Sequence, residues 1–374
     1  MTLQIPASML PADGRFGAGP SKVRTGQVDA LVAAGDPARP VLGTSHRQAP
    51  VKDLVRRVRT GLTELFALPD GYEVALGNGG STAFWEVATA SLVRHRAQHA
   101  VFGEFGGKFA AATARAPFLA DPEVVEAAPG GVAYLTPSDA VDVYATPHNE
   151  TSTGAMAPVR RPAGDALVLT DATSGAGALP VDLHETDVYY FGPQKAFAAD
   201  GGLWLALLSP AAVARAAEVE TAGDGRWVPE FLSLTTALDN SRKDQTLNTP
   251  AVGTLVMLAD QVEWLLEHGG LDWSVRRCER SAEHLYDWAA DRDWATPFVA
   301  DPAERSTVVG TIDLDETIDA SAVVDHLRAN GVYDVFPYRK LGRNQLRVGM
   351  FPAVDPDDVA ALTACVDHVV ARLT

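Results

Sequence analysis

Cysteine is scarce in this chain, with only Cys278 and Cys365 among 374 residues. Two cysteines cannot build the disulfide framework typical of small secreted proteins, which favours a reducing compartment. Basic charge is also short, because 31 lysines and arginines face 48 aspartates and glutamates, for a formal net charge of −17. Nucleic-acid and anionic-membrane surfaces both need a basic footprint, so this balance argues against either partner. A few clustered arginines can still bind a small anion.

Long apolar runs and targeting signals are missing as well. No stretch approaches the roughly 18 consecutive apolar residues of a membrane-spanning helix. The first 20 residues lack a basic segment followed by an apolar one, as a secretion signal would have. The histidines show no spacing typical of a metal site, so we expect no bound metal. We therefore expect a soluble, cytoplasmic protein.

One lysine lies in unusual surroundings. Residues 188–191 (VYYF) form an apolar run that ends at Gly192-Pro193, and a second apolar run follows at 203–208. Between them, Lys195 lies among apolar neighbours. Such surroundings disfavour the charged amine, which lowers its pKa and makes it a candidate nucleophile or base. On this stretch alone, a lysine that snorkels from a strand end is an equally good interpretation.

Short apolar runs alternate with helical patterns through much of the chain. Strands are expected over 72–76, 99–102, 140–146, 166–170, 188–191 and 203–208. Strands connected by helices indicate an α/β domain with a mostly parallel sheet, whose ligands bind at the carboxyl ends of the strands. Asn149, Asp171 and Lys195 follow three of these strands. Residues 77–82 (GNGGST) open a helix after the first strand, a geometry that presents backbone N–H groups to an anion.

The pattern changes after residue 268. Helices over 271–291, 320–330 and 355–373 alternate with strands over 306–314 and 346–351, which predicts a smaller α+β domain. Residues 1–20 are rich in glycine and proline and predict an extended arm, and residues 227–250 predict a long loop. We therefore expect an arm over 1–16, a large domain over 17–258 and a small C-terminal domain over 259–374.

Asp171 and Lys195 suggest a cofactor when they are considered together. Burying a carboxylate at the end of a strand costs free energy unless a cation or hydrogen-bond donors contact it. Taken alone, Asp171 is explained equally well by an Asx-turn. Pyridoxal 5'-phosphate needs a lysine that can form a Schiff base and a carboxylate beside its pyridine nitrogen. Gly80, Ser81 and Thr82 supply a candidate phosphate cup. A competing interpretation, a non-catalytic α/β module that binds a nucleotide or a protein partner, leaves the aspartate and the lysine unexplained.

Motifs spread over nearly the whole chain carry a family resemblance. They are FGAGPSKV, TSHRQAPV, GNGGSTAFWE, GEFGGKF, TPHNETSTG, LTDATSGAGALPVD, FGPQKAFAADGGLW, TLNTPAV and LRVGMFP. In these motifs the chain resembles the class-V aminotransferase group of fold-type I pyridoxal-phosphate enzymes, and within it the phosphoserine aminotransferases. The resemblance implies an α/β large domain with a mostly parallel mixed sheet, plus a smaller α+β C-terminal domain.

The resemblance also implies roles for individual residues around the cofactor. Lys195 would bond to the cofactor and move the proton, Asp171 would pair with the pyridinium, and Phe105 would stack on the ring. The other implied cofactor contacts are Gly80, Ser81, Thr82, Thr151, Gln194, Asn248 and Thr249. The last two would come from a second subunit, which implies a homodimer with shared active sites.

For substrates, the resemblance implies glutamate and 3-phosphohydroxypyruvate, with O-phosphoserine and 2-oxoglutarate as products in serine biosynthesis. Arg347 would clamp the α-carboxylate, and His46, Arg47 and Arg339 would surround the substrate phosphate, because guanidinium groups suit both anions. The related phosphohydroxythreonine reaction of pyridoxine biosynthesis stays open. So does the alternative of a class-V transaminase for small unphosphorylated substrates, of the alanine/serine–glyoxylate type.

Overall fold

The computed structural model describes residues 3–223 and 225–373. Its larger part is built on a seven-stranded sheet with the order β1-β9-β8-β7-β4-β2-β3. Strand β9 is antiparallel to its neighbours β1 and β8, and the other neighbours are parallel. The mostly parallel mixed sheet expected from the sequence is thus confirmed. The strands are β1 (Glu73–Asn78), β2 (Ala97–Val101), β3 (Glu123–Glu126), β4 (Val143–Pro147), β7 (Leu167–Asp171), β8 (Val188–Phe191) and β9 (Leu203–Leu208).

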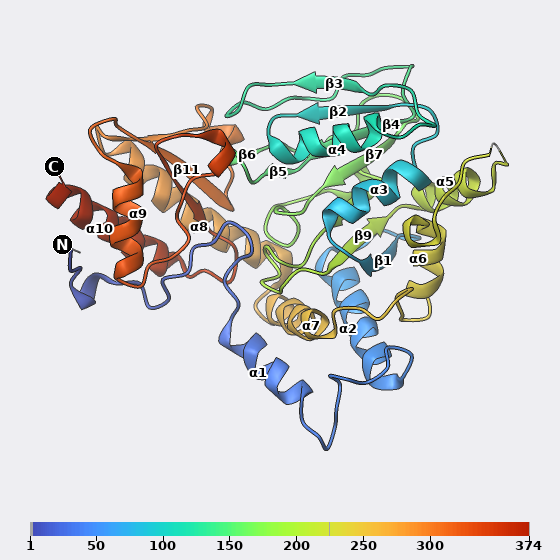
Figure 1. The fold of residues 1–374 in the computed structure, drawn as a ribbon, viewed down its shortest axis with the longest axis horizontal. Helices are drawn as coiled ribbons and strands as arrows, with labels where there is room; N and C mark the ends of the chain where they lie inside the picture. Colours follow the sequence, from blue (N-terminus) through green and yellow to red (C-terminus); the bar gives the residue numbers. More distant parts are fainter. Residues whose placement is uncertain (1–2, 224, 374) are drawn as a thin grey trace.

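Helices cover both faces of this sheet, which is why its central strands are apolar and buried along their whole length. Apolar residues of α3, α4, α5 and α6 form one core cluster with the sheet, and those of α2 and α7 form another (Figure 1). Helix α1 (Thr25–Ala34) packs against the second cluster. The covering helices are α2 (Ala49–Leu65), α3 (Ser81–Ser91), α4 (Glu104–Ala114), α5 (Pro210–Thr221), α6 (Leu234–Ser241) and α7 (Val252–Glu267).

A smaller, strand-rich region follows in the C-terminal part, drawn in orange and red in Figure 1. Its antiparallel sheet joins β10 (Ala295–Pro297), β11 (Val309–Leu314) and β12 (Gln345–Gly349). The helices packed around it are α8 (Gly270–Ala290), α9 (Ala320–Ala329) and α10 (Pro356–Leu373). Ile5 and Phe16, near the start of the chain, are buried in the same core. In the described part of the chain, no helix combines the length and apolar character needed to cross a membrane.

Short elements complete the chain between these regions. A two-stranded sheet pairs β5 (Asn149–Glu150) with β6 (Ala155–Met156) just beyond β4. The 3-10 helices are η1 (Ala7–Met9), η2 (Leu183–Glu185), η3 (Glu230–Leu232), η4 (Pro302–Glu304) and η5 (Arg339–Leu341).

The prediction of a long loop over residues 227–250 is wrong in the middle of that range, where α6 forms. Ser233 begins this helix, because its side-chain oxygen accepts a hydrogen bond from the Thr236 N–H. Leu234 and Leu238, four residues apart, are buried on the sheet. The helix is only eight residues long, too short for its periodicity to stand out in the sequence.

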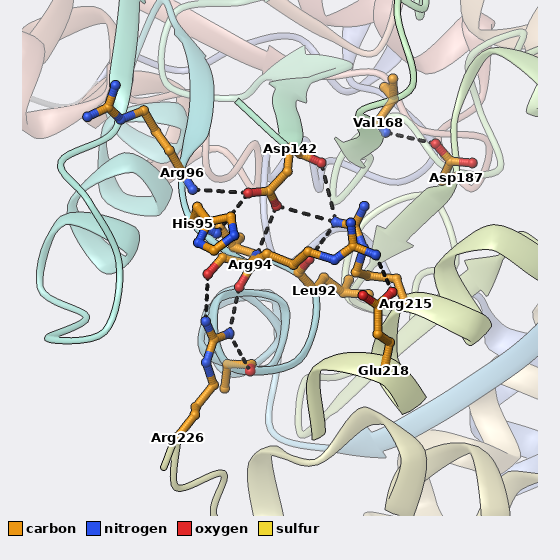
Figure 2. Close-up of polar contacts among 12 residues, drawn as sticks. Leu92, Arg94, His95, Arg96, Asp142, Val168, Asp187, Arg215, Glu218 and Arg226 are labelled. Atoms are coloured by element: carbon orange, nitrogen blue, oxygen red, sulfur yellow. Dashed lines mark hydrogen bonds and ion pairs between the residues drawn. The ribbon is translucent and has the colours of Figure 1, made fainter. Parts of the chain in front are cut away.

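The parallel strands begin at one edge of the sheet, which we call the amino edge. Two carboxylates there bind neighbouring segments of the chain (Figure 2). Asp142, just before β4, accepts hydrogen bonds from the backbone N–H groups of Arg94, His95 and Arg96 at 2.8, 2.8 and 3.1 Å. Its Oδ1 also lies 3.3 Å from Nη1 of Arg215. Asp142 therefore joins the start of β4 to the segment that leads into β2.

Asp187 has the equivalent position before β8. Its Oδ2 accepts a hydrogen bond from the Val168 N–H at 2.9 Å and lies 2.7 Å from Nη1 of Arg161. At the amino edge, each of these carboxylates is thus paired with an arginine of the same chain.

Candidate active site

The opposite edge of the sheet, at which β4, β7 and β8 end, carries a cavity of about 330 Å³. We call it the carboxyl edge. The lining residues are Gly19, Pro20, Gly80, Ser81, Thr82, Trp85, Phe105, Pro147, Asn149, Thr151, Asp171, Thr173, Gln194 and Lys195. Most of the cofactor contacts expected from the sequence are therefore brought together around one space.

Asp171 is the last residue of β7, and only 8% of it is exposed. Its Oδ2 accepts a hydrogen bond from the indole Nε1 of Trp85 at 2.9 Å. Its Oδ1 accepts from the backbone N–H and the hydroxyl of Thr173, at 2.9 and 2.5 Å. Within residues 3–223 and 225–373, no ion pair neutralises this carboxylate. A buried carboxylate with only neutral donors is suited to a cationic ligand.

Lys195 lies in the turn after β8 and is buried. Its Nζ donates a hydrogen bond to the backbone oxygen of Ala18 at 2.7 Å. Burial lowers the pKa of Lys195 to about 7, and the positive charge of Arg347 adds to this shift, while the charges of Glu150 and Asp171 oppose it. Lys195 is thus buried as its apolar neighbours in the sequence predict, and its reactivity stays a prediction.

Residues 18–21 hold this lysine from the far N-terminal part of the chain. A Cβ on Gly19 would lie 1.8 Å from Lys195 Nζ, so only glycine fits there. Ser21 binds the turn as well, through its N–H to the Gln194 oxygen at 2.9 Å and through its hydroxyl to the Lys195 oxygen. No local pattern in the sequence predicts this role of the FGAGPSKV motif, because the contacts span more than 170 residues.

The expected phosphate cup lies at the start of α3. Gly80 is the N-cap of this helix, and a Cβ placed on it would meet nothing within 4 Å. The first N–H groups of a helix have no acceptor within the helix, so they can bind an anion in the cavity. Thr173 links the cup to the carboxylate, because its hydroxyl lies 2.6 Å from the Ser81 hydroxyl and also bonds Asp171.

Two buried side-chain oxygens at the cavity have no hydrogen-bond partner among the described residues. They are Oδ1 of Asn149 and Oε1 of Gln194. Asn149 Nδ2 and the Thr151 hydroxyl both donate to Oγ of Ser174, at 2.9 and 2.8 Å, which fixes these side chains. Unpaired buried acceptors are costly, so they are suited to donors on a ligand.

Arg347 reaches this site from β12 of the smaller region. Its Nη1 donates to the backbone oxygen of Thr151 at 3.3 Å, and its guanidinium lies 5.4 Å from the ring centroid of Tyr338. Arg343 behaves differently, because it forms an ion pair with Asp313 and lies 4.4 Å from the ring centroid of Phe298. Only Arg347 of these two thus contacts the loop that lines the cavity.

The other expected site residues do not line the cavity. His46 and Arg47 lie with the 245–249 segment instead, through His46 Nδ1 to the Thr249 hydroxyl at 3.1 Å and Arg47 Nη1 to Gln245 Oε1 at 3.0 Å. Asn248, Thr249 and Arg339 are exposed. Within a single chain, the structure therefore separates the cofactor and substrate contacts expected from the sequence into two groups.

Sequence reasoning missed Trp85 and Thr173 as partners of Asp171. Trp85 lies on the apolar face of α3, where an aromatic residue is ordinarily read as core. Thr173 follows Asp171 by two residues, and an Asx-turn donor at that spacing was the available signal.

Comparison with known proteins identifies the family and agrees with the fold. The family model described as "Aminotransferase class-V" matches residues 133–333. The phosphoserine aminotransferase of Nocardioides sp. strain JS614 is 60% identical over 375 residues, covering 99% of each chain. A solved phosphoserine aminotransferase from Cytophaga hutchinsonii has a TM-score of 0.86 at 21% identity, covering 95% of this chain and 99% of its own. One from Bacillus circulans subsp. alkalophilus has a TM-score of 0.83 at 20% identity, covering 96% and 99%.

The fold is thus shared with solved phosphoserine aminotransferases. The chain belongs to the class-V aminotransferases and, within them, to the phosphoserine aminotransferase family.

Proposed function

We propose that the chain binds pyridoxal 5'-phosphate and transfers the amino group of glutamate to 3-phosphohydroxypyruvate, giving O-phosphoserine and 2-oxoglutarate. The family supports both the cofactor and the substrate class. The observation that carries the proposal is the buried pair of Asp171 and Lys195 on one cavity, with a helix start beside them. The same site is a candidate for the phosphohydroxythreonine reaction of pyridoxine biosynthesis.

The residues of the cavity fit this cofactor. Asp171 has no cationic partner in the described residues and would pair with the pyridinium nitrogen. Ser81 and Thr82 at the start of α3 would hold the phosphate, and Phe105 would stack on the ring. When bound, the cofactor supplies an electron sink for the bonds at the substrate Cα.

Lys195 would hold the cofactor and then move the proton. A pKa of about 7 leaves a large share of this amine neutral near neutral pH, so it can act both as a nucleophile and as a base. Its Nζ would take the proton from the substrate Cα and give it back at a later step of the amino transfer. The Ala18 carbonyl, which accepts a hydrogen bond from Nζ, would orient the amine between these steps.

Arginines would recognise the two anionic substrates. Arg347 is half-buried beside Thr151 and would clamp the α-carboxylate. We propose that His46, Arg47 and Arg339 bind the substrate phosphate, and that Asn248 and Thr249 reach the cofactor phosphate of a second subunit. Exposure of Arg47, Asn248, Thr249 and Arg339 in the single chain supports a homodimer with shared sites, which we place in the cytoplasm.

We also propose the division of the chain into an arm over 1–16, a large domain over 17–258 and a small domain over 259–374. Helix α7 runs from Val252 to Glu267 across the second boundary, so the two domains would be joined by a continuous helix. Hydrogen exchange at increasing denaturant concentration tests the division, because the two domains are expected to lose protection as separate units.

One assay tests the reaction. Purified protein is supplied with pyridoxal 5'-phosphate, glutamate and 3-phosphohydroxypyruvate, and 2-oxoglutarate is measured. We expect turnover that is lost in Lys195→Ala. Turnover with alanine or serine and glyoxylate, but none with the phosphorylated substrate, would instead indicate a transaminase of small unphosphorylated substrates.

A further inference from the structure

The proposed function leaves the carboxylate of Glu150 without a role. This residue ends the short strand β5, one position after Asn149, and none of its surface is exposed. Its Oε2 accepts hydrogen bonds from the backbone N–H groups of Phe105 and Gly106 at 3.0 and 3.1 Å. Its Oε1 accepts from the hydroxyl of Ser152 at 2.7 Å. The three contacts come from two segments, 105–106 and the loop at Ser152, that lie far apart in the sequence.

Those N–H groups belong to the first turn of α4, where a helix has no acceptors of its own. Helices usually solve this with a serine, threonine, aspartate or asparagine at the N-cap, but the N-cap of α4 is Gly103. A Cβ on Gly103 would lie 2.2 Å from Glu150 Cγ, so the N-cap has no side chain because Glu150 fills that place. Ser152 completes the cap by accepting the Glu104 N–H at 3.0 Å.

Phe105 is the second residue of α4 and lines the cavity. Its ring position therefore depends on a cap supplied by the same loop that carries Asn149 and Thr151. Burial raises the pKa of Glu150, whereas the hydrogen bonds from Ser152 and the Gly106 N–H, together with the helix dipole, favour its charged form. This explains how Glu150 is buried without a cationic side chain paired to it in residues 3–223 and 225–373.

We infer that Glu150, together with Ser152, is a positioning residue that caps α4 from outside the helix and thereby fixes Phe105 against the cofactor ring. The inference rests on the proposed function for the identity of the ring. The cap itself does not, because it joins two segments of the chain whether or not a ligand is bound.

The matched pair of variants is Glu150→Gln and Asp142→Asn. Both change a carboxylate that accepts several backbone N–H groups into an amide of nearly the same size, one beside the cavity and one at the amino edge (Figure 2). Three quantities are measured: the dissociation constant of pyridoxal 5'-phosphate, the circular dichroism induced in its visible band, and amide hydrogen exchange in the apo chain.

For Glu150→Gln we expect about tenfold faster exchange at Phe105 and Gly106, about tenfold weaker cofactor binding and a reduced induced signal. For Asp142→Asn we expect faster exchange at residues 94–96, with cofactor binding within twofold of the unsubstituted chain. Glu150→Gln with unchanged binding and an unchanged induced signal would overturn the inference. An unsubstituted chain that does not bind the cofactor would overturn the proposed function instead.

A double-mutant cycle with Phe105→Leu tests whether the effect passes through the ring. If Glu150 acts by positioning Phe105, Glu150→Gln should change cofactor affinity less than twofold in the Phe105→Leu background. A full tenfold effect in that background would contradict the inference. Ser152→Ala removes the acceptor of the Glu104 N–H and one donor to Glu150 but keeps the Glu150 carboxylate, so it provides a milder variant should Glu150→Gln fail to fold.

Discussion

The carboxylates at the two edges of the large sheet have different partners. At the amino edge, Asp142 and Asp187 each lie beside an arginine, with N–O distances of 3.3 and 2.7 Å. At the carboxyl edge, Asp171 and Glu150 receive hydrogen bonds from neutral donors, and no ion pair reaches either of them within the described residues.

Strand β4 shows the contrast within a few residues. Asp142 precedes it and Glu150 follows it, and each carboxylate accepts backbone N–H groups from a distant segment. Charge at the amino edge is neutralised within the chain, so it contributes to folding. Charge at the carboxyl edge is left for a ligand, so that edge is stabilised fully only when a cation is bound.

The largest expected effect is on the unfolding free energy of the apo chain, and it comes from Lys195, the amine of the carboxyl edge. Its folded pKa of about 7 lies below its ordinary value of 10.5, so between these pH values the unfolded chain binds the extra proton. Stability of the apo chain therefore rises with pH across this window, by up to about 5 kcal/mol from this group.

In the apo Lys195→Met variant this contribution is absent. Its advantage in unfolding free energy over the unsubstituted chain should be greatest at pH 7 and shrink as the pH approaches 10. Urea unfolding at several pH values measures the difference. An advantage that does not change with pH would contradict a buried, largely neutral lysine.

The second effect concerns the two aspartates on neighbouring strands. Asp171→Asn should lower kcat for amino transfer by about 10²- to 10³-fold, because the charge beside the cofactor ring nitrogen is lost. Asp187→Asn should leave kcat within twofold, since its carboxylate contacts Arg161 and the backbone at the other edge. Similar losses in both variants would remove the distinction between the edges.

For folding stability, the aspartate at the amino edge should matter more than the aspartate at the carboxyl edge. Asp142→Asn leaves Arg215, a buried guanidinium, without its carboxylate, and we expect a loss of about 2–3 kcal/mol in the unfolding free energy of the apo chain. Asp171→Asn removes an uncompensated buried charge and should change that free energy by less than about 1 kcal/mol. Denaturant titrations of the two apo variants provide the comparison.

The smallest effect is expected from Trp85→Phe. This change keeps an aromatic ring in the core and removes the indole N–H that donates to Asp171 at 2.9 Å. Loss of one donor to a buried carboxylate costs about 1–3 kcal/mol, so cofactor affinity should fall by about tenfold. Phe84→Leu, which alters packing on the same helix without touching Asp171, serves as the control, and an equal loss there would assign the effect to packing.

Much of the fold and part of the site could be predicted from the sequence. Apolar runs separated by helical patterns were sufficient to predict the parallel sheet. The positions of Asp171, Asn149 and Lys195 after strands were sufficient to predict that they lie at the carboxyl edge. Local patterns carry both signals.

Long-range contacts could not be predicted in this way. The helix that carries Phe105 begins at Glu104 with a glycine at its N-cap, because Glu150 and Ser152 cap it from elsewhere in the chain. Residues 18–21 hold Lys195 across a much longer separation, 177 residues between Ala18 and Lys195. The separation of His46 and Arg47 from the cavity depends on how α2 and the 245–249 segment pack, which the resemblance to known enzymes does not specify.

The central claim is that the carboxyl edge holds pyridoxal 5'-phosphate between Asp171 and Lys195. Borohydride reduction of the cofactor-loaded protein, followed by peptide mass spectrometry, tests it most directly. We predict a reduced cofactor adduct on Lys195, with no adduct in Lys195→Ala. An adduct on another lysine, or none on the loaded protein, would contradict the account.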